Sequence, residues 1–290
     1  MPLKGFKYPD GELVSLKDVK ERNIDIERMG MALPTLLYMS EQRENDRPPS
    51  TTELISGTCQ AYLQRQEDYY VNPQENAFSL AGTIHHSKLE DSAASGKTDE
   101  LPLEYKGITG IVDLYDAKSK SLIDYKNTGS YKASKILGMQ STTKEHATDR
   151  YKKSGKWGIK GSFKKVKVFY RDEASSDFGD WGWQINFYRI MLESSGYPVD
   201  NMYVQMTIRD GGVHAAKSRG IYNNIYLVEV PYINDDILRT KLGKRDALLH
   251  SLESKTVPTM CTPEETWGGR KCENYCPVRE ACPYMENKNG

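Results

Sequence analysis

Residues 107–129 read GITGIVDLYDAKSKSLIDYKNTG, and this stretch decides the fold prediction. Two runs rich in β-branched and aromatic residues, ITGIVDLY and SLIDYKNT, flank the turn-forming DAKSK, a pattern that predicts a β-hairpin. Each run contains a carboxylate, Asp113 in the first and Asp124 in the second, and Lys126 follows two residues after Asp124. Because side chains alternate between faces along a strand, Asp124 and Lys126 are expected to share one face.

Two neighbouring carboxylates repel each other, and burial adds to the cost. A divalent cation between them would cancel the repulsion, since Mg²⁺ typically uses one or two carboxylates. A lysine beside that site would orient a water molecule or stabilise negative charge on a phosphate. The alternative is a structural Asp–Lys pair with Asp113 at a strand end, and the spacing alone slightly favours it.

The rest of the chain alternates between helix and strand patterns. A capped helix is expected from about Ser50 to residue 70, and further helices at 81–95, 181–197 and 235–255. Residues 201–210 and 224–233 are strand candidates. This order predicts an α/β fold, a central mixed β-sheet flanked by helices.

The composition excludes several classes of protein. The 290 residues contain 40 Lys and Arg against 40 Asp and Glu, so attraction to a polyanion must come from local patches. The N-terminus has no signal-peptide core, and the longest apolar run, residues 29–39, is too short to span a membrane. We therefore expect a soluble, cytoplasmic protein with no membrane partner.

Five cysteines are present: Cys59, Cys261, Cys272, Cys276 and Cys282. An odd number, clustered at one end, argues against a disulfide framework and favours metal binding in a reducing compartment. Four thiolates suit either a [4Fe–4S] cluster or tetrahedral zinc. The alternative, a set of free cysteines, is disfavoured by the compact tail, in which a proline follows both Cys276 and Cys282.

Residues 141–180 form a polar, basic segment with interleaved aromatic residues. Basic side chains attract phosphates regardless of sequence, and aromatic rings stack on unpaired bases. Lys164, Lys165, Lys167 and Trp157 are therefore candidates for contact with single-stranded DNA. The alternative is a solvated loop whose aromatic residues pack on the body of the protein.

Four motifs occur in the order typical of one nuclease superfamily. The pattern Asp113-x10-Asp124-x-Lys126 resembles the PD-(D/E)xK motif. GTIHHSKLE at 82–90 and the Gln184-x-x-x-Tyr188 pattern resemble helix motifs of RecB-type nuclease domains. Cys59 and the C-terminal cysteines resemble the iron–sulfur staple of the AddB nuclease and of the CRISPR-associated RecB-like exonucleases.

This resemblance implies a restriction-endonuclease-like core with a set of assigned roles. His86, Asp113 and Asp124 would bind Mg²⁺ or Mn²⁺ together with the backbone carbonyl of Tyr125, and Lys126 would be the catalytic lysine. Gln184 and Tyr188 would position the DNA strand and this lysine. His85 is the competitor of His86. A [4Fe–4S] cluster, with Zn²⁺ as the alternative metal, would be held by Cys59, Cys272, Cys276 and Cys282. Cys261 could replace Cys272, because the three-residue spacing to Cys276 departs from the two residues that are usual.

The resemblance also suggests how the chain is divided. Residues 1–49 would be an N-terminal extension and residues 50–256 the RecB-like nuclease core, with a basic insertion at about 141–180. Residues 257–290 would be a cysteine-rich tail that packs back on the helix carrying Cys59.

The implied function is that of a metal-dependent DNA exonuclease acting in DNA end processing, as in recombination, phage biology or CRISPR adaptation. Its partners would be DNA, as single strands or duplex ends, and proteins of those pathways, in a bacterial, archaeal or phage-infected cell. The rival is a non-catalytic or zinc-stapled DNA-binding module on the same fold.

Overall fold

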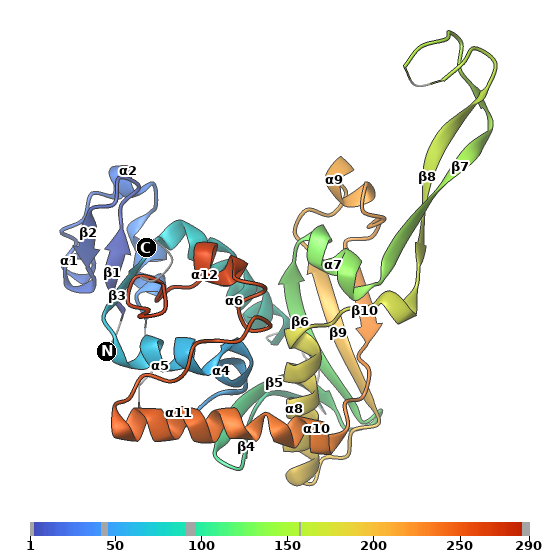
Figure 1. Ribbon diagram of the computed structural model, residues 1–290. Helices are drawn as coiled ribbons and strands as arrows, with labels where there is room; N and C mark the ends of the chain where they lie inside the picture. Colours follow the sequence, from blue (N-terminus) through green and yellow to red (C-terminus); the bar gives the residue numbers. More distant parts are fainter. Residues whose placement is uncertain (1–2, 42–45, 91–96, 157, 286–290) are drawn as a thin grey trace.

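A five-stranded sheet lies at the centre of the larger body, in the order β10–β9–β6–β5–β4 (Figure 1). The computed structural model describes residues 3–41, 46–90, 97–156 and 158–285, and all their side chains except those of residues 86–88, 90 and 97–100. The strands are β4 (Lys97–Tyr105), β5 (Ile108–Asp116), β6 (Ser121–Thr128), β9 (Asn201–Ile208) and β10 (Ile225–Glu229). β6 and β9 are parallel and the other neighbours antiparallel, which confirms the predicted α/β fold with a mixed central sheet.

The predicted hairpin is formed by β5 and β6. Its ladder runs from Asp116, opposite Ser121, to Leu114, opposite Ile123. Residues 117–120 make the turn, and Lys120 adopts a left-handed conformation there with φ of 48°. β4, which was not among the predicted strands, pairs with β5 along nearly its whole length.

Parallel pairing of β6 with β9 requires a crossover connection, and α7 (Ser130–Ile136), a long β-hairpin and α8 (Asp180–Ser194) supply it. Along β9, Met202, Val204, Met206 and Ile208 are buried, while the residues between them are half-buried. The buried residues belong to the same core as α8, which therefore covers this face of the sheet.

The remaining helices of the larger body are shorter than predicted. The helix expected over residues 50–70 is two helices, α4 (Thr51–Ser56) and α5 (Thr58–Gln66), because Gly57 between them adopts φ of 109°. The helix expected over residues 235–255 is likewise divided into α10 (Asp235–Thr240) and α11 (Leu242–Ser254). The helix expected over residues 81–95 is α6 (Ala77–Glu90), which begins four residues earlier, and residues 91–95 lie outside the described residues. The other elements are α9 (His214–Lys217) and the 3₁₀ turns η1 (Pro73–Asn76) and η2 (Glu173–Ser175).

The N-terminal residues build a second, smaller sheet in the order β2–β1–β3. Its strands and the helices beside it are β1 (Leu3–Lys7), β2 (Leu13–Ser15), β3 (Tyr69–Val71), α1 (Leu16–Lys20), α2 (Ile26–Met29) and α3 (Leu33–Met39). They enclose a core of their own that includes Phe6, Val19 and Leu36. The small sheet thus takes its third strand from beyond residue 49.

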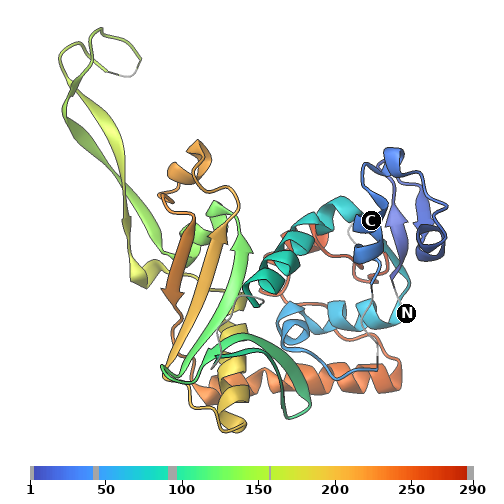
Figure 2. The same ribbon diagram turned by 180° about the vertical axis from the view of Figure 1, so that it is seen from behind.

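The basic segment is an ordered β-hairpin that projects from the body (Figures 1 and 2). It consists of β7 (Met139–Arg150) and β8 (Phe163–Arg171), which pair with each other as a two-stranded sheet. The segment is therefore a pair of strands and not a loop, although Phe169 near its base does pack against Gly220 of the body.

The C-terminal tail runs back across α5 and α11 and includes α12 (Arg270–Asn274). Val278 of the tail is buried with Tyr62 and Leu63 of α5 and with Leu248 of α11. Among the helices of the described chain, none combines the length and the apolarity needed to cross a bilayer.

Candidate active site

Asp124 and Lys126 lie on β6 and share a face, as the strand period requires. Asp124 is 1% exposed, next to buried Leu122 and opposite Val204 of β9. The Lys126 ammonium lies 2.7 Å from Oδ2 of Asp124. A buried carboxylate is costly without a partner, and this ion pair offsets part of that cost.

Asp113 lies where β5 and β6 separate. The ladder ends at Leu114 and Ile123, so Asp113 and Asp124 are the next residues beyond its end on the two strands. Oδ2 of Asp113 accepts a hydrogen bond of 2.7 Å from the backbone N–H of Tyr125. This carboxylate therefore replaces a ladder hydrogen bond and links β5 to the segment of β6 between Asp124 and Lys126.

Two side chains of α8, Gln184 and Tyr188, extend the set of contacts from Lys126. The Lys126 ammonium donates to Oε1 of Gln184 at 3.0 Å, and Nε2 of Gln184 donates to the Tyr188 hydroxyl at 2.9 Å. The two residues are four apart, hence one above the other on the helix. Lys126 is consequently held between a carboxylate on its own strand and an amide on a helix, with its side chain 17% exposed.

Buried polar contacts fix α8 against the chain that follows β10. Asn186 is fully buried; its amide donates to the carbonyls of Gly182 and Pro231, and its oxygen accepts from the N–H of Ile233. The guanidinium of buried Arg189 pairs with Glu193 at 2.8 Å and with Asp235 at 2.5 Å. These contacts set the height and rotation of the helix, and with them the positions of Gln184 and Tyr188.

Gly110, three residues before Asp113, lies where β5 packs closely against α8. A Cβ at this position would lie 2.8 Å from the Tyr188 ring and 2.9 Å from the sulfur of Met191. Any larger residue would therefore push α8 away from β5.

The histidine candidates are on α6, which meets the other face of β6. Nε2 of His85 lies 2.8 Å from the hydroxyl of Thr207. The His85 ring packs edge-on against the Tyr125 ring, with 6.5 Å between the ring centroids. His86 occupies the next position on this helix, but its side chain is outside the described residues.

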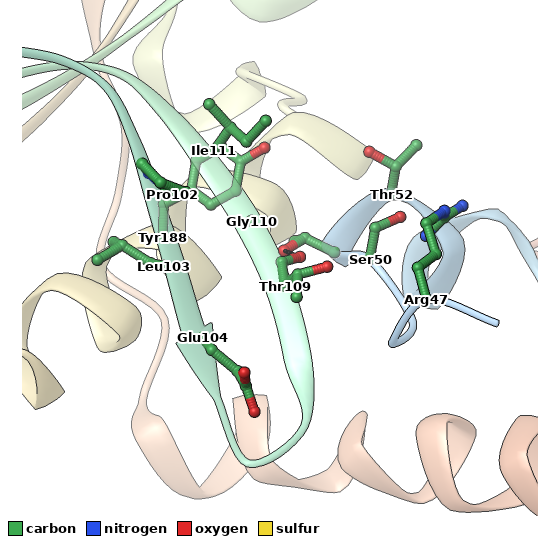
Figure 3. Close-up of a pocket in the computed structure, with 11 residues that line it drawn as sticks. Arg47, Ser50, Thr52, Pro102, Leu103, Glu104, Thr109, Gly110, Ile111 and Tyr188 are labelled. Carbon is green, nitrogen blue, oxygen red and sulfur yellow. Dashed lines mark hydrogen bonds between the residues drawn. The ribbon is translucent and has the colours of Figure 1, made fainter. Parts of the chain in front are cut away.

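A cavity of about 560 Å³ adjoins Tyr188 (Figure 3). Its walls come from β4, β5, α4 and the residues before α4, and they are Arg47, Ser50, Thr51, Thr52, Pro102, Leu103, Glu104, Thr109, Gly110, Ile111 and Tyr188. Sequence reasoning did not find this cavity, because its walls come from segments about 50 residues apart. We call it the Tyr188 cavity.

An ion-paired cluster at the edge of this cavity was also missed. Glu53 binds Arg65 at 2.8 Å and Arg47 at 2.8 Å and caps α4 by accepting from the N–H of Ser50. Burial opposes the ionisation of Glu53, but the hydrogen bonds from Arg65, Arg47 and Ser50 outweigh it and lower its pKa to about 2. The Ser50-x-x-Glu53 capping box was the available sequence signal.

All five cysteines line one cavity of about 30 Å³ between α5 and the tail. None of them forms a disulfide, and the side chains of Cys261 and Cys282 influence the titration of Cys59. The hydrogen bond from Cys59 lowers the pKa of Cys261 to about 6, and the same bond, together with burial, raises that of Cys59. Both Cys261 and Cys272 thus belong to the cluster, which leaves the choice between them open.

Within the described residues, no three or more His, Cys, Asp or Glu side chains are spaced as in an assembled metal site. The donor types nevertheless match the metals considered: carboxylates and a backbone carbonyl suit Mg²⁺ or Mn²⁺, and thiols suit zinc or an iron–sulfur cluster.

The DNA-contact candidates lie on the projecting hairpin. Lys164, Lys165 and Lys167 are on β8, and Lys164 pairs with Asp149 of β7 at 2.7 Å. Trp157 lies outside the described residues.

Comparison with known proteins gives little further guidance. No protein-family model matches the chain, and no curated protein matches it significantly. A Eubacterium rectale protein of known crystal structure, named "Putative exonuclease", is similar over 74% of this chain, with 11% identity and a TM-score of 0.28. The match covers 60% of that protein's length.

Proposed function

We propose that this protein is a metal-dependent nuclease that hydrolyses DNA phosphodiester bonds, of the RecB-like type. The observation that carries the proposal is the continuous set of contacts from Asp124 through Lys126 and Gln184 to Tyr188, beside Asp113. The ammonium of Lys126 is thereby held between a carboxylate on its own strand and an amide on α8, which gives it a fixed direction.

Asp113, Asp124 and the carbonyl of Tyr125 would hold Mg²⁺ or Mn²⁺, with His86 as a further ligand by resemblance. The bound cation would supply Lewis-acid chemistry, lowering the pKa of a water and neutralising charge on the phosphate. Asp113 already accepts a hydrogen bond from the N–H of Tyr125, the residue whose carbonyl is the proposed ligand, so it holds the β6 backbone next to that carbonyl.

Lys126 would donate hydrogen bonds to the attacking water and to the phosphate oxygens. Its ammonium has three protons. One of them is donated to Gln184, and Asp124 pairs with the same ammonium, which leaves donor capacity for substrate. The amide of Gln184 can accept from Lys126 only with its oxygen, and the Tyr188 hydroxyl on the other side keeps that orientation.

We further propose exonucleolytic action in DNA end processing, and a [4Fe–4S] cluster or zinc ion in the cysteine cavity. The role of that centre would be structural, because the cavity joins α5 to the C-terminal tail. Five free thiols around one cavity also favour a reducing compartment such as the cytoplasm.

Degradation of end-labelled single- and double-stranded DNA tests the function. We expect cleavage with Mg²⁺ or Mn²⁺, none with EDTA, and none from the Asp124→Ala and Lys126→Ala variants. Circular DNA that resists cleavage would establish the need for an end. If wild-type protein binds DNA but cleaves neither form with any divalent metal, the protein is instead a non-catalytic DNA-binding module.

A further inference from the structure

The hairpin formed by β7 and β8 is the most exposed part of the molecule. Both views show it extending away from the sheet and from the helices around it (Figures 1 and 2). Its two strands pair with each other and with no other described strand. An isolated two-stranded ribbon is marginally stable in water, so one that stands free is expected to gain order from a partner. We call residues 139–171 the arm.

The arm holds a large share of the positive charge of the chain. It has ten Lys and Arg residues against Glu145 and Asp149, a net charge of +8. Because the whole chain is neutral, the remaining residues carry −8. This separation of charge favours a polyanionic partner for the arm and keeps that partner off most of the other surface.

The arrangement of the basic side chains favours phosphates over unpaired bases. Arg150 covers the ring of Phe163 at 3.7 Å, and Lys167 covers that of Phe169 at 4.9 Å. The Tyr151 ring lies against Gly158 at the tip. Aromatic faces that are occupied in this way are poor platforms for base stacking, whereas the cations above them remain exposed. Tyr170, which is 51% exposed, lies at the base of the arm opposite Gln140.

The dimensions of the arm fit a groove of duplex DNA. The major groove admits a two-stranded β-ribbon. The nine residues of β8 extend for ~26 Å at ~3.3 Å per residue, which is most of the ~34 Å of one helical turn. Between Glu145 and Arg150 the register shifts, and such irregularities increase the twist of a ribbon.

We propose that the arm binds duplex DNA along a groove, several base pairs away from the site of hydrolysis. The inference rests on the proposed function and deepens it: the substrate is a DNA end continuous with a duplex, not an isolated single strand. The arm holds the duplex, while Lys126 and the two carboxylates act on the end.

Binding measured in EDTA, where no hydrolysis occurs, tests the proposal with the full chain. The probes are fluorescent DNA duplexes of increasing length, single strands of equal length and a duplex RNA. We expect duplex affinity to rise with length until about one helical turn is covered beyond the end. Single strands and A-form RNA, whose major groove is too narrow for a ribbon, should bind at least ~10-fold more weakly.

A fourfold variant of exposed arm lysines, K152Q/K153Q/K165Q/K167Q, should lose this dependence on duplex length. The slope of log affinity against log salt should decrease by up to ~3.6, that is ~0.9 for each phosphate that the variant no longer neutralises. The matched control, K17Q/K20Q/K106Q/K118Q, removes four exposed lysines elsewhere and should behave as wild type. Circular dichroism verifies that both variants are folded.

Three results would overturn the arm proposal: an unchanged salt slope in the arm variant, equal loss of affinity for single strands and duplexes, or duplex RNA that binds as tightly as duplex DNA. The hydrolysis proposal fails independently, if wild-type protein binds duplexes through the arm but cleaves no DNA with Mg²⁺ or Mn²⁺. Conversely, cleavage without any dependence of binding on the arm lysines would leave the nuclease assignment intact and remove only the arm proposal.

Discussion

Lys126 on β6 donates a hydrogen bond of 3.0 Å to Oε1 of Gln184 on α8, 58 residues later in the chain. The contact joins the central sheet to the helix that covers it, at the position of the proposed chemistry. It also converts a flexible lysine into a side chain with a fixed direction, since Asp124 holds the same ammonium from the strand.

Substitution Gln184→Ala is expected to lower kcat by ~10–100-fold, or ~1.4–2.7 kcal/mol of transition-state stabilisation, with little change in KM. Lys126 would keep its charge but lose one of its two anchors. Tyr188→Phe removes only the hydroxyl behind Gln184 and should cost less. Exposed Gln74 provides the control: if Gln184→Ala behaves as Gln74→Ala does, the positioning role is wrong.

Replacing either strand carboxylate with its amide should abolish metal-dependent cleavage. We expect Asp113→Asn and Asp124→Asn to lower the rate by roughly 10³-fold or more, because each removes a charge that balances the cation. DNA binding in EDTA should not weaken, since a negative charge is removed. Asp116→Asn, on the same strand at the far end of the ladder, should cleave as wild type does.

Substitutions of the two histidines of α6 should have different effects. His86→Ala is expected to raise the Mg²⁺ concentration needed for half-maximal cleavage by at least ~10-fold, as removal of a metal ligand would. His85→Ala should lower the melting temperature and leave the metal requirement unchanged, because His85 contacts Thr207 and Tyr125. The opposite pattern would assign the ligand to His85.

Metal analysis of anaerobically purified protein should find one thiolate-bound centre per chain. Iron and sulfide with a brown colour would establish a cluster, and a single zinc would establish the alternative. Each of the five cysteines is replaced by serine in a separate variant. Four of these variants should have a lower metal content and a lower stability, and the fifth should not. The variant that retains the metal, Cys261→Ser or Cys272→Ser, identifies the extra thiol; full metal content in both of these variants would contradict a four-thiolate site.

The Glu53–Arg65 ion pair should make the free energy of unfolding depend on pH in the acid range. The pKa of Glu53 is about 2 in the folded protein against 4.5 for a free side chain, so its contribution is present above pH 4.5 and is lost as the pH falls toward 2. Glu53→Gln should lower the free energy of unfolding at pH 7 by roughly 1.5–3 kcal/mol, because Arg65 stays buried without its charged acceptor. Chemical denaturation of both proteins at pH 7 and pH 3 measures the effect, and the difference between them should shrink at the lower pH.

The local parts of the candidate site could be predicted because they follow from short-range periodicity. Asp124 and Lys126 share a face since strands alternate every two residues, and Gln184 and Tyr188 share one since helices repeat every 3.6. The hairpin that contains Asp113 and Asp124 was visible as two β-rich runs around a turn. The strands of the projecting arm were not predicted: β8 alternates only over residues 165–168, and β7 is polar along most of its length.

The sequence by itself determined the alternation of strands and helices, the placement of Asp113 and Asp124 on the two strands of one hairpin, and the cysteine-rich end. Only the tertiary structure decided that Gln184 meets Lys126, that all five cysteines border one cavity and that the Tyr188 cavity exists. Each of these brings together segments that are tens to hundreds of residues apart. Such distances are set by the packing of α8, α5 and the tail against the sheet, and no local pattern of residues encodes them.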